Sequence, residues 1–254
     1  MIKTGLVLSG GAARGVAHLG ILEVIEEMGI TIEAISGVSS GAIVGALYGN
    51  GIKPREILEI ICKTKQLQLI RPALSKTGFF RIEVLEDILK KYLNHQTFES
   101  LNLKLYVAAT RLKDGKTKYF QTGDLIRPVV ASSCIPVLFK PYEIDEEFFV
   151  DGGIINNLPV EPLITNCDRI IGLLCNPIDS IYQVTNMKSL LERTLLMAIN
   201  TNTYSRRSQC DLLLEPPELG RFKAMNLSKA TEIYEIGYRY ANSRKKDLEK
   251  LFNC

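Results

Sequence analysis

Apolar residues along the chain occur in short unbroken runs, separated by longer stretches in which they recur every third or fourth position. Short runs are typical of buried strands, and the periodic stretches are typical of helices with one apolar side. The pattern predicts strands at 5–8, 34–38, 104–109, 117–121, 148–150, 169–174 and 211–214. It predicts helices at 15–28, 40–48, 54–62, 81–93, 125–133, 187–204 and 228–251.

The strand–helix–strand–helix start predicts an α/β fold of three layers, with a mostly parallel central sheet between helices. A chain of 254 residues can bury one sizeable core, so we expect a single domain over residues 1–254. Its motif-bearing part covers about residues 5–175, and a helical part follows at about 180–254. The irregular loop 64–80 is either a lid or a segment packed on the domain, and packing is favoured because exposed apolar loops are uncommon.

Composition excludes several classes of protein. With 46% hydrophobic and 23% charged residues the chain has an ordinary globular balance, and its net charge of +3 gives no argument for nucleic acid. The apolar run 6–8 is broken by glycines at once, which is too short for a signal peptide, and no window of 18 apolar residues predicts a membrane span. Six cysteines without a C-x-x-C pair predict reduced, mostly buried thiols and no metal site. We therefore expect a cytoplasmic protein, with peripheral contact to the inner face of a membrane left open.

A glycine-rich loop follows the first predicted strand and reads Gly10-Gly11-Ala12-Ala13-Arg14-Gly15. Its backbone N–H groups and the positive end of the next helix can hold a phosphate or a developing oxyanion. A P-loop is excluded, because Val16 and Ala17 stand where Lys and Ser or Thr are required. A dinucleotide fingerprint is weak because Ala12 replaces its second glycine. An oxyanion hole needs only free amides.

Gly37-Val38-Ser39-Ser40-Gly41 matches G-x-S-x-G between a predicted strand and a predicted helix. In that context the sharp turn lifts the serine hydroxyl clear of the backbone, and Gly37 and Gly41 leave the turn unobstructed. A merely tight turn of small residues would give the same pentapeptide, but the surrounding strand and helix favour a nucleophile. We predict that Ser39 is the nucleophile.

A nucleophilic serine needs a group that accepts its proton. The two histidines lie in unpromising places: His18 among apolar positions of a predicted helix, and His95 in a polar loop. Asp151 ends a predicted strand, at the edge of the sheet where α/β sites collect, and Gly152 and Gly153 follow it. A carboxylate can act as general base, although a turn aspartate that bonds its own backbone would look the same.

These three motifs in this order resemble the patatin-like phospholipase family over about residues 5–175. The similarity includes the loop ending in Arg14-Gly15, the elbow at 37–41, Asp151-Gly152-Gly153, and the segments 131–141 and 156–159. The resemblance implies a Ser-Asp dyad without histidine. Ser39 would attack the acyl carbonyl, Asp151 would take its proton, and amides of residues 10–15 would hold the oxyanion. Ala12 stands where many members have a third glycine, which is acceptable if its dihedral angles suit a residue with a Cβ atom.

The resemblance further implies hydrolysis of lipid acyl esters, of the phospholipase A or lipid acyl hydrolase type, through an acyl-serine intermediate and without metal or organic cofactor. Two alternatives remain: a soluble esterase or thioesterase with the same dyad, and a regulatory or scaffold protein that keeps the fold with little turnover. The head group, the positional preference and the oligomeric state are not determined by the sequence.

A basic stretch near the C-terminus bears on membrane contact. Residues 238–252 carry five cations, interleaved with aromatic and aliphatic side chains: Arg239, Arg244, Lys245, Lys246 and Lys250. A basic helix with an apolar side can lie on anionic lipid. The same pattern fits a surface helix that docks its apolar side on the domain, and both interpretations stay open.

Overall fold

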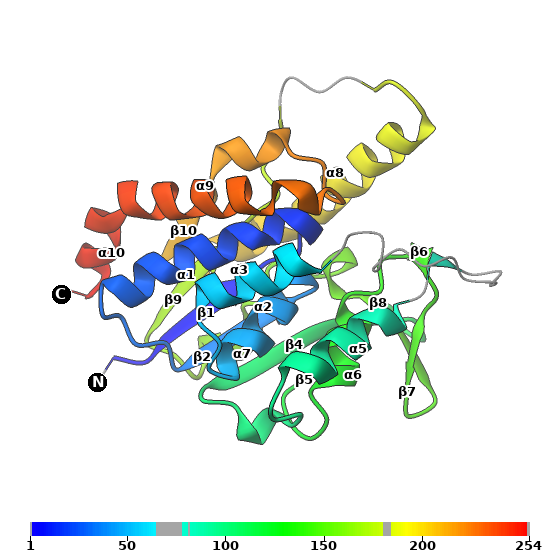
Figure 1. Ribbon diagram of the computed structural model, residues 1–254, viewed down its shortest axis with the longest axis horizontal. Coiled ribbons are helices and arrows are strands. Elements are labelled where there is room, and N and C mark those ends of the chain that lie inside the picture. Colours follow the sequence, from blue (N-terminus) through cyan, green and yellow to red (C-terminus); the bar gives the residue numbers. More distant parts are fainter. Residues whose placement is uncertain (1, 65–77, 81, 180–183, 253–254) are drawn as a thin grey trace.

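The computed structural model describes residues 2–64, 78–80, 82–179 and 184–252. Within these residues an eight-stranded sheet has the order β10-β9-β1-β2-β4-β8-β7, with β5 beside β4 (Figure 1). Its strands are β1 (Thr4–Leu8), β2 (Ala34–Val38), β4 (Lys104–Arg111), β5 (Lys116–Phe120), β7 (Tyr142–Ile144), β8 (Glu147–Asp151), β9 (Arg169–Leu173) and β10 (Leu212–Leu214). A small second sheet pairs β3 (Gly78–Phe80) with β6 (Val137–Phe139).

Strand direction brings the predicted motifs to one edge of the sheet. The strands β10, β9, β1, β2 and β4 run parallel, whereas β5, β8 and β7 run antiparallel to their neighbours. Leu8 at the end of β1 pairs with Gly37, near the end of β2. Because Val38 pairs with Ala108 and Asp151 pairs with Ala109, the ends of β2 and β8 lie level with each other on the two sides of β4.

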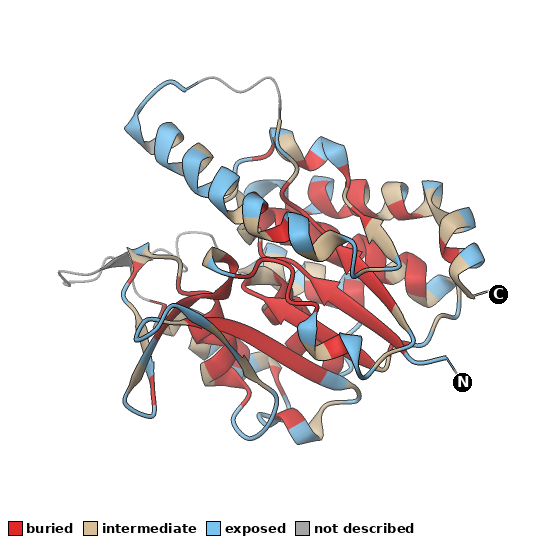
Figure 2. Cartoon of the chain, turned by 180° about the vertical axis from the view of Figure 1, so that it is seen from behind, coloured by how far each residue is buried: buried red, intermediate tan, exposed pale blue. Residues whose placement is uncertain are grey.

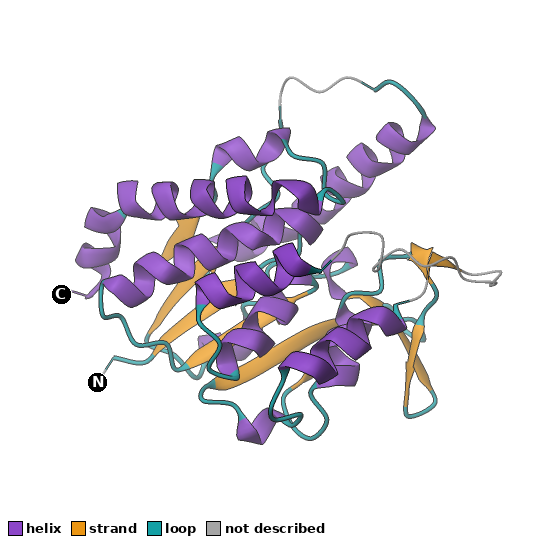
Figure 3. Cartoon of the chain, in the orientation of Figure 1, coloured by secondary structure: helices purple, strands orange, loops and turns teal. Residues whose placement is uncertain are grey.

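Helices cover both faces of the sheet (Figure 3). They are α1 (Ala17–Glu27), α2 (Ser40–Gly49), α3 (Pro54–Lys63), α5 (Glu83–Tyr92), α6 (Ile126–Ser132), α7 (Glu161–Ile164), α8 (Met187–Arg207), α9 (Ala230–Ser243) and α10 (Lys245–Phe252). Short 3-10 helices are η1 (Ala12–Val16), η2 (Phe98–Ser100), η3 (Gly152–Ile154), η4 (Pro217–Arg221) and η5 (Leu227–Lys229). The predicted three-layer α/β fold with a mostly parallel sheet is confirmed.

The core lies on both sides of the sheet because side chains of a strand alternate between its faces. Leu6 and Leu8 enter the larger apolar cluster with residues of α1, α2 and α9, and Val7 enters a smaller cluster on the other face. Figure 2 shows the central strands β1, β2 and β4 buried along most of their length. The helices α1 and α9 approach closely: a Cβ atom on Gly20 would lie 2.2 Å from the backbone oxygen of Tyr234.

Local details differ from the prediction. The first helix begins as the 3-10 turn η1, and the helix predicted at 228–251 breaks at Arg244 into α9 and α10. The short elements β6, β7 and α7 were not predicted, because runs of three or four residues carry too little periodicity. Of the predicted loop 64–80, residues 65–77 lie outside the described residues, and 78–80 form β3.

The C-terminal helices dock their apolar side on the domain. In α9 Ile233, Tyr234 and Ile236 are buried, and in α10 Leu248 is buried while Phe252 packs partly against the same cluster. The packing interpretation of this basic stretch is therefore the one that the structure supports, since its apolar residues are already covered. In the described part of the chain, no helix combines the length and the hydrophobicity needed to cross a bilayer.

Candidate active site

Ser39 lies at the sharp turn between β2 and α2. Its backbone has a φ of 53°, a left-handed conformation that a residue with a Cβ atom adopts at a cost. The turn is held from a distant part of the chain, because the Ser39 amide donates to Ser132 Oγ at 2.8 Å. Ser132 Oγ in turn donates to the Ala108 carbonyl at 2.6 Å. The strained backbone of Ser39, with its amide anchored, turns the chain sharply from the strand into the helix.

Asp151 faces Ser39 from the end of β8. Its carboxylate accepts a hydrogen bond from the Gly153 amide at 2.8 Å, and the Ser39 hydroxyl lies near enough to interact with it. Only 7% of its surface is exposed. Burial raises the pKa of Asp151 from its ordinary 3.8 to about 6, although the nearby Ser39 hydroxyl and the Gly153 amide oppose the rise. A carboxylate with that pKa is ionised at neutral pH and is a better proton acceptor than an exposed aspartate.

Neither histidine is available as a triad base. His18 is fully buried, and its Nε2 bonds the Ser9 carbonyl at 2.9 Å, which makes Nε2 the protonated nitrogen. Burial lowers the pKa of His18 to about 4, so the ring is neutral. His95 is exposed on a loop. The packed position predicted for His18 and the loop position predicted for His95 are both confirmed.

The glycine-rich loop after β1 passes directly over Ser39. A Cβ atom on Gly10 would lie 3.0 Å from the Ser39 Cβ. Ala12 has a φ of 50°, within the left-handed region that a residue with a Cβ atom can still occupy. The substitution of alanine for glycine here is therefore tolerated by the backbone.

Half of the amides predicted for an oxyanion hole are already in use. The Gly10 amide donates to Asn157 Oδ1 at 3.0 Å, the Ala13 amide to the Ala224 carbonyl at 2.7 Å, and the Arg14 amide to the Gly11 carbonyl at 3.1 Å. An N–H group carries one proton. We therefore remove the amides of these three residues from the predicted oxyanion hole. Within the described residues, the amides of Gly11 and Ala12 have no hydrogen-bond acceptor.

The Arg14 side chain and Gly15 have structural roles in the loop. The Arg14 side chain turns away from Ser39 and donates from Nε to the Phe222 carbonyl at 2.8 Å. It thereby anchors the segment after η4. Gly15 lies within η1, where a Cβ atom would clash with Ser40 Oγ at 2.3 Å.

The predicted turn glycines are required for close approach. A Cβ atom on Gly41 would lie 2.2 Å from the Leu8 carbonyl oxygen, and one on Gly152 would lie 2.2 Å from that of Ala108. Gly37 and Gly153 are similarly crowded. None of the four has a positive φ, so the turns need the missing side chain and not a left-handed backbone.

Asparagines behind Ser39 hold the two loops together. Asn157 accepts from the Gly10 amide, and Asn176 Nδ2 donates to the Gly10 carbonyl at 2.6 Å. On α8, Asn202 Oδ1 accepts from the Asn157 amide at 3.1 Å, and its Nδ2 donates to the Ile154 carbonyl at 2.9 Å. One network thus joins the glycine-rich loop to the turn that follows Asp151.

This network is the part of the site that sequence reasoning missed. Asn157 belonged to a segment noted only for its family resemblance, and Asn176 and Asn202 stand in no recognisable motif. Buried amides that bond backbone groups become visible only once strands and helices distant in sequence are brought together. In the described part of the chain, no group of three or more His, Cys, Asp or Glu side chains is placed to hold a metal ion.

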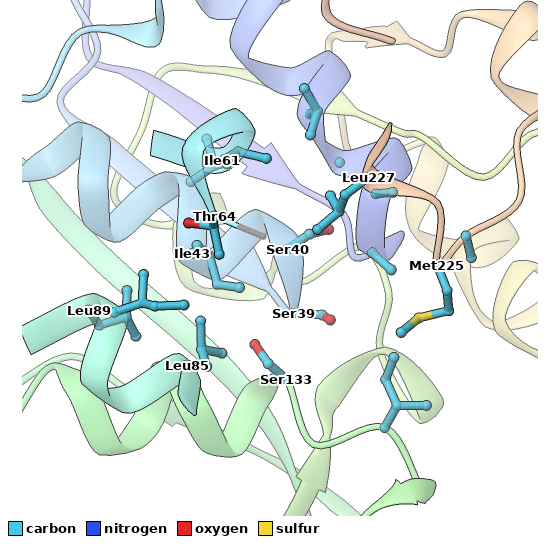
Figure 4. A pocket seen from close by; sticks show the side chains of 18 of the residues that line it. Ser39, Ser40, Ile43, Ile61, Thr64, Leu85, Leu89, Ser133, Met225 and Leu227 are labelled. Carbon is cyan, nitrogen blue, oxygen red and sulfur yellow. The ribbon is translucent and has the colours of Figure 1, made fainter. Parts of the chain in front are cut away.

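An apolar pocket of about 210 Å³ opens in front of Ser39. It is lined by α2, α3, α5, β6 and the segment between η4 and η5, with long aliphatic side chains on most sides: Ile43, Val44, Leu47, Ile60, Ile61, Ile82, Leu85, Ile88, Leu89, Ile135, Met225 and Leu227. In Figure 4 Leu85 and Leu89 lie to one side of Ser39, and Met225 and Leu227 to the other. The pocket matches the apolar chain of an acyl group.

The fold is shared with bacterial proteins of known structure. VipD from Legionella pneumophila superimposes with a TM-score of 0.56 at 14% identity, covering 96% of this chain and 67% of VipD. ExoU, in its complex with SpcU from Pseudomonas aeruginosa, gives 0.55 at 17% identity, covering 99% of this chain and 52% of that one. At such low identity these likenesses establish the fold alone.

Sequence similarity defines the family. Residues 6–164 match the model of patatin-like phospholipases, and the chain belongs to that family. It is 32% identical over 177 residues to an uncharacterised NTE family protein of Mycobacterium tuberculosis, which covers 68% of this chain and 49% of the relative. It is 31% identical over 185 residues to lysophospholipase NTE1 of Cryptococcus neoformans, which covers 66% of this chain and 11% of that protein. The chain therefore spans about half the length of the mycobacterial relative and far less of the fungal one.

Proposed function

We propose that this chain is a serine acyl hydrolase that cleaves lipid acyl esters with a Ser39–Asp151 dyad. The observation that carries the proposal is the proximity of the Ser39 hydroxyl, which lines an apolar pocket, to the buried Asp151 carboxylate. Family membership and the lysophospholipase relatives support a lipid ester as the substrate. A lipid with a single acyl chain suits this pocket, whose lining is mainly aliphatic.

The proposed reaction has two half-reactions. Asp151 accepts the Ser39 proton as Oγ attacks the acyl carbonyl, and the resulting oxyanion is held by the amides of Gly11 and Ala12. The tetrahedral intermediate collapses, the ester C–O bond breaks, and protonated Asp151 returns the proton to the leaving alcohol. Water then attacks the acyl-serine with Asp151 again as base, which releases the fatty acid and restores the hydroxyl.

Selective labelling tests this proposal. A fluorophosphonate should modify the wild-type protein at Ser39, and Ser39→Ala should abolish both labelling and ester hydrolysis while its fold stays intact by circular dichroism. Ser133→Ala is the matched control, because Ser133 also lines the pocket but donates its hydroxyl to the Val129 carbonyl at 2.9 Å. Retained turnover in Ser39→Ala, or label on another serine, would refute the mechanism.

A panel of substrates, tested on the same protein, separates the substrate classes. Activity on lysophosphatidylcholine should exceed activity on acetyl and butyryl esters and on an acyl-thioester. Hydrolysis restricted to short soluble esters or thioesters would favour the soluble esterase alternative. A folded protein without labelling or turnover would favour the regulatory or scaffold alternative.

A further inference from the structure

The helix α8 exposes a face whose described side chains are uncharged. Figures 1 and 2, which view the chain from opposite sides, both show its N-terminal half projecting from the body of the molecule. Met187 is 79% exposed, Leu191 55% and Met197 51%. The side chains of α8 that are described as exposed are all uncharged: Met187, Leu190, Leu191, Thr194, Leu195, Met197, Ala198, Thr201, Tyr204 and Ser205. A helix face in water normally carries charged residues, so this face is suited to another environment.

The arginines of α8 point toward the body of the protein. Arg193 donates to the Asp179 carbonyl at 2.8 Å, Arg206 pairs with Glu161 at 2.7 Å, and Arg207 pairs with Glu215 at 2.9 Å. The N-terminus of the helix is also capped, because Asn186 and Ser189 form a reciprocal capping box. This face is thus a property of a capped helix whose three arginines bond groups on the body of the protein.

The inner end of α8 is fixed to the active site. Asn200 Nδ2 donates to the Asn176 carbonyl at 2.8 Å, and Asn202 bonds the Asn157 amide and the Ile154 carbonyl. The exposed face therefore keeps a set orientation relative to Ser39. In both views the tip of α8 and β6 project from the same side of the molecule. Because Phe139 of β6 lines the pocket, the pocket reaches toward the same end of the molecule.

We propose that the exposed face of α8 inserts into the surface of the lipid assembly that holds the substrate, an inference that rests on the proposed function. A protein partner would need a matching concave surface and roughly one hydrogen bond per 100–200 Å² of interface. A lipid surface needs neither, since it accepts a convex apolar helix and the binding strength follows the apolar area buried. Because the side chains described as exposed on this face are uncharged, we expect binding to depend on apolar burial and not on anionic lipid.

Vesicle co-sedimentation tests the docking surface on protein that carries Ser39→Ala, so that binding is measured without turnover. This protein should bind phosphatidylcholine vesicles equally well in low and high salt. Adding Met187→Gln and Leu191→Gln, which keep a good helix former at both positions, should lower partitioning by roughly tenfold or more. The matched control adds Ile2→Gln and Ile164→Gln, which are 41% and 49% exposed near the opposite edge of the sheet, and it should bind normally.

Activity separates this inference from the proposed function. With Ser39 present, Met187→Gln/Leu191→Gln should lose most of its hydrolysis of vesicle-embedded lipid and keep wild-type hydrolysis of a soluble butyryl ester. Vesicle binding that persists in this variant, or that disappears in high salt, overturns the docking surface. So does a wild-type dimer, measured by light scattering, that the variant converts to monomer. Loss of all hydrolase activity in the wild type would instead refute the proposed function, and the binding result with Ser39→Ala would still stand.

Discussion

Ser39 stands between two walls of opposite character. Behind it, asparagine side chains bond the backbone of the glycine-rich loop and of the turn after Asp151. In front of it, the pocket is lined mainly by aliphatic side chains from several helices. Hydrogen bonds depend steeply on distance and angle, whereas apolar contact tolerates replacement by residues of similar volume. The polar wall should therefore determine how fast the site reacts, and the apolar wall which acyl chain it accepts.

The largest effect should come from Asp151, the proposed base beside Ser39. Asp151→Asn cannot take the Ser39 proton, so we expect kcat to fall by roughly 10²–10⁴-fold. In the wild type kcat/KM should fall as the pH drops through about 6, since the carboxylate must be ionised. Asp145→Asn, whose side chain is 86% exposed in the wild type, is the matched control. A pH profile without this limb, or an active Asp151→Asn, would contradict the dyad.

The substitution Asp151→Asn, which should lower activity, should raise the stability of the folded protein. The pKa of Asp151 in the folded protein lies above its ordinary value, so the protonated form favours folding below about pH 4, and this contribution is lost as the pH rises through about 6. The rise from 3.8 to about 6 corresponds to on the order of 3 kcal/mol. Thermal unfolding should therefore show inactive Asp151→Asn to be more stable than the wild type above neutral pH, with the difference vanishing in acid.

A smaller loss of activity should follow from removing one hydrogen bond of the polar wall. Asn157→Ala removes the acceptor of the Gly10 amide, and a misplaced glycine-rich loop should lower kcat by roughly ten- to a hundredfold with little change in KM. Asn166→Ala is the control, because Asn166 is an exposed asparagine that bonds only the Pro162 carbonyl of its own helix region. Steady-state kinetics on one ester distinguish the outcomes: a change in KM alone would mean that Asn157 contributes to substrate binding and not to positioning.

The smallest effect should come from the apolar wall. Leu85→Ala removes contacts with the acyl chain, so kcat/KM for long-chain esters should fall by roughly tenfold while acetyl esters react as before. Leu112→Ala, at a position 49% exposed and outside the pocket, should leave the ratio unchanged. The ratio of long-chain to acetyl-ester kcat/KM is the measurement. Equal losses on both esters would show that Leu85 supports the catalytic geometry, and the contrast between the walls would fail.

The sequence by itself determined the features that are local. The turn at Ser39 was predictable because a strand, a G-x-S-x-G pentapeptide and a helix are consecutive in the chain. The buried position of His18 followed from the apolar residues on its own helix. Most strands and long helices could likewise be predicted, since their periodicity spans enough residues to be recognised.

Only the tertiary structure decided which groups are left free. Six amides of the glycine-rich loop look equivalent in sequence, but Asn157 and the Ala224 carbonyl occupy two of them from more than a hundred residues away. The same holds for α8, whose sequence predicts an ordinary helix and whose uncharged face is exposed only because its asparagines and arginines are turned inward. A hydrogen bond or an exposed face depends on what the rest of the chain brings nearby, and local periodicity carries no record of those distant partners.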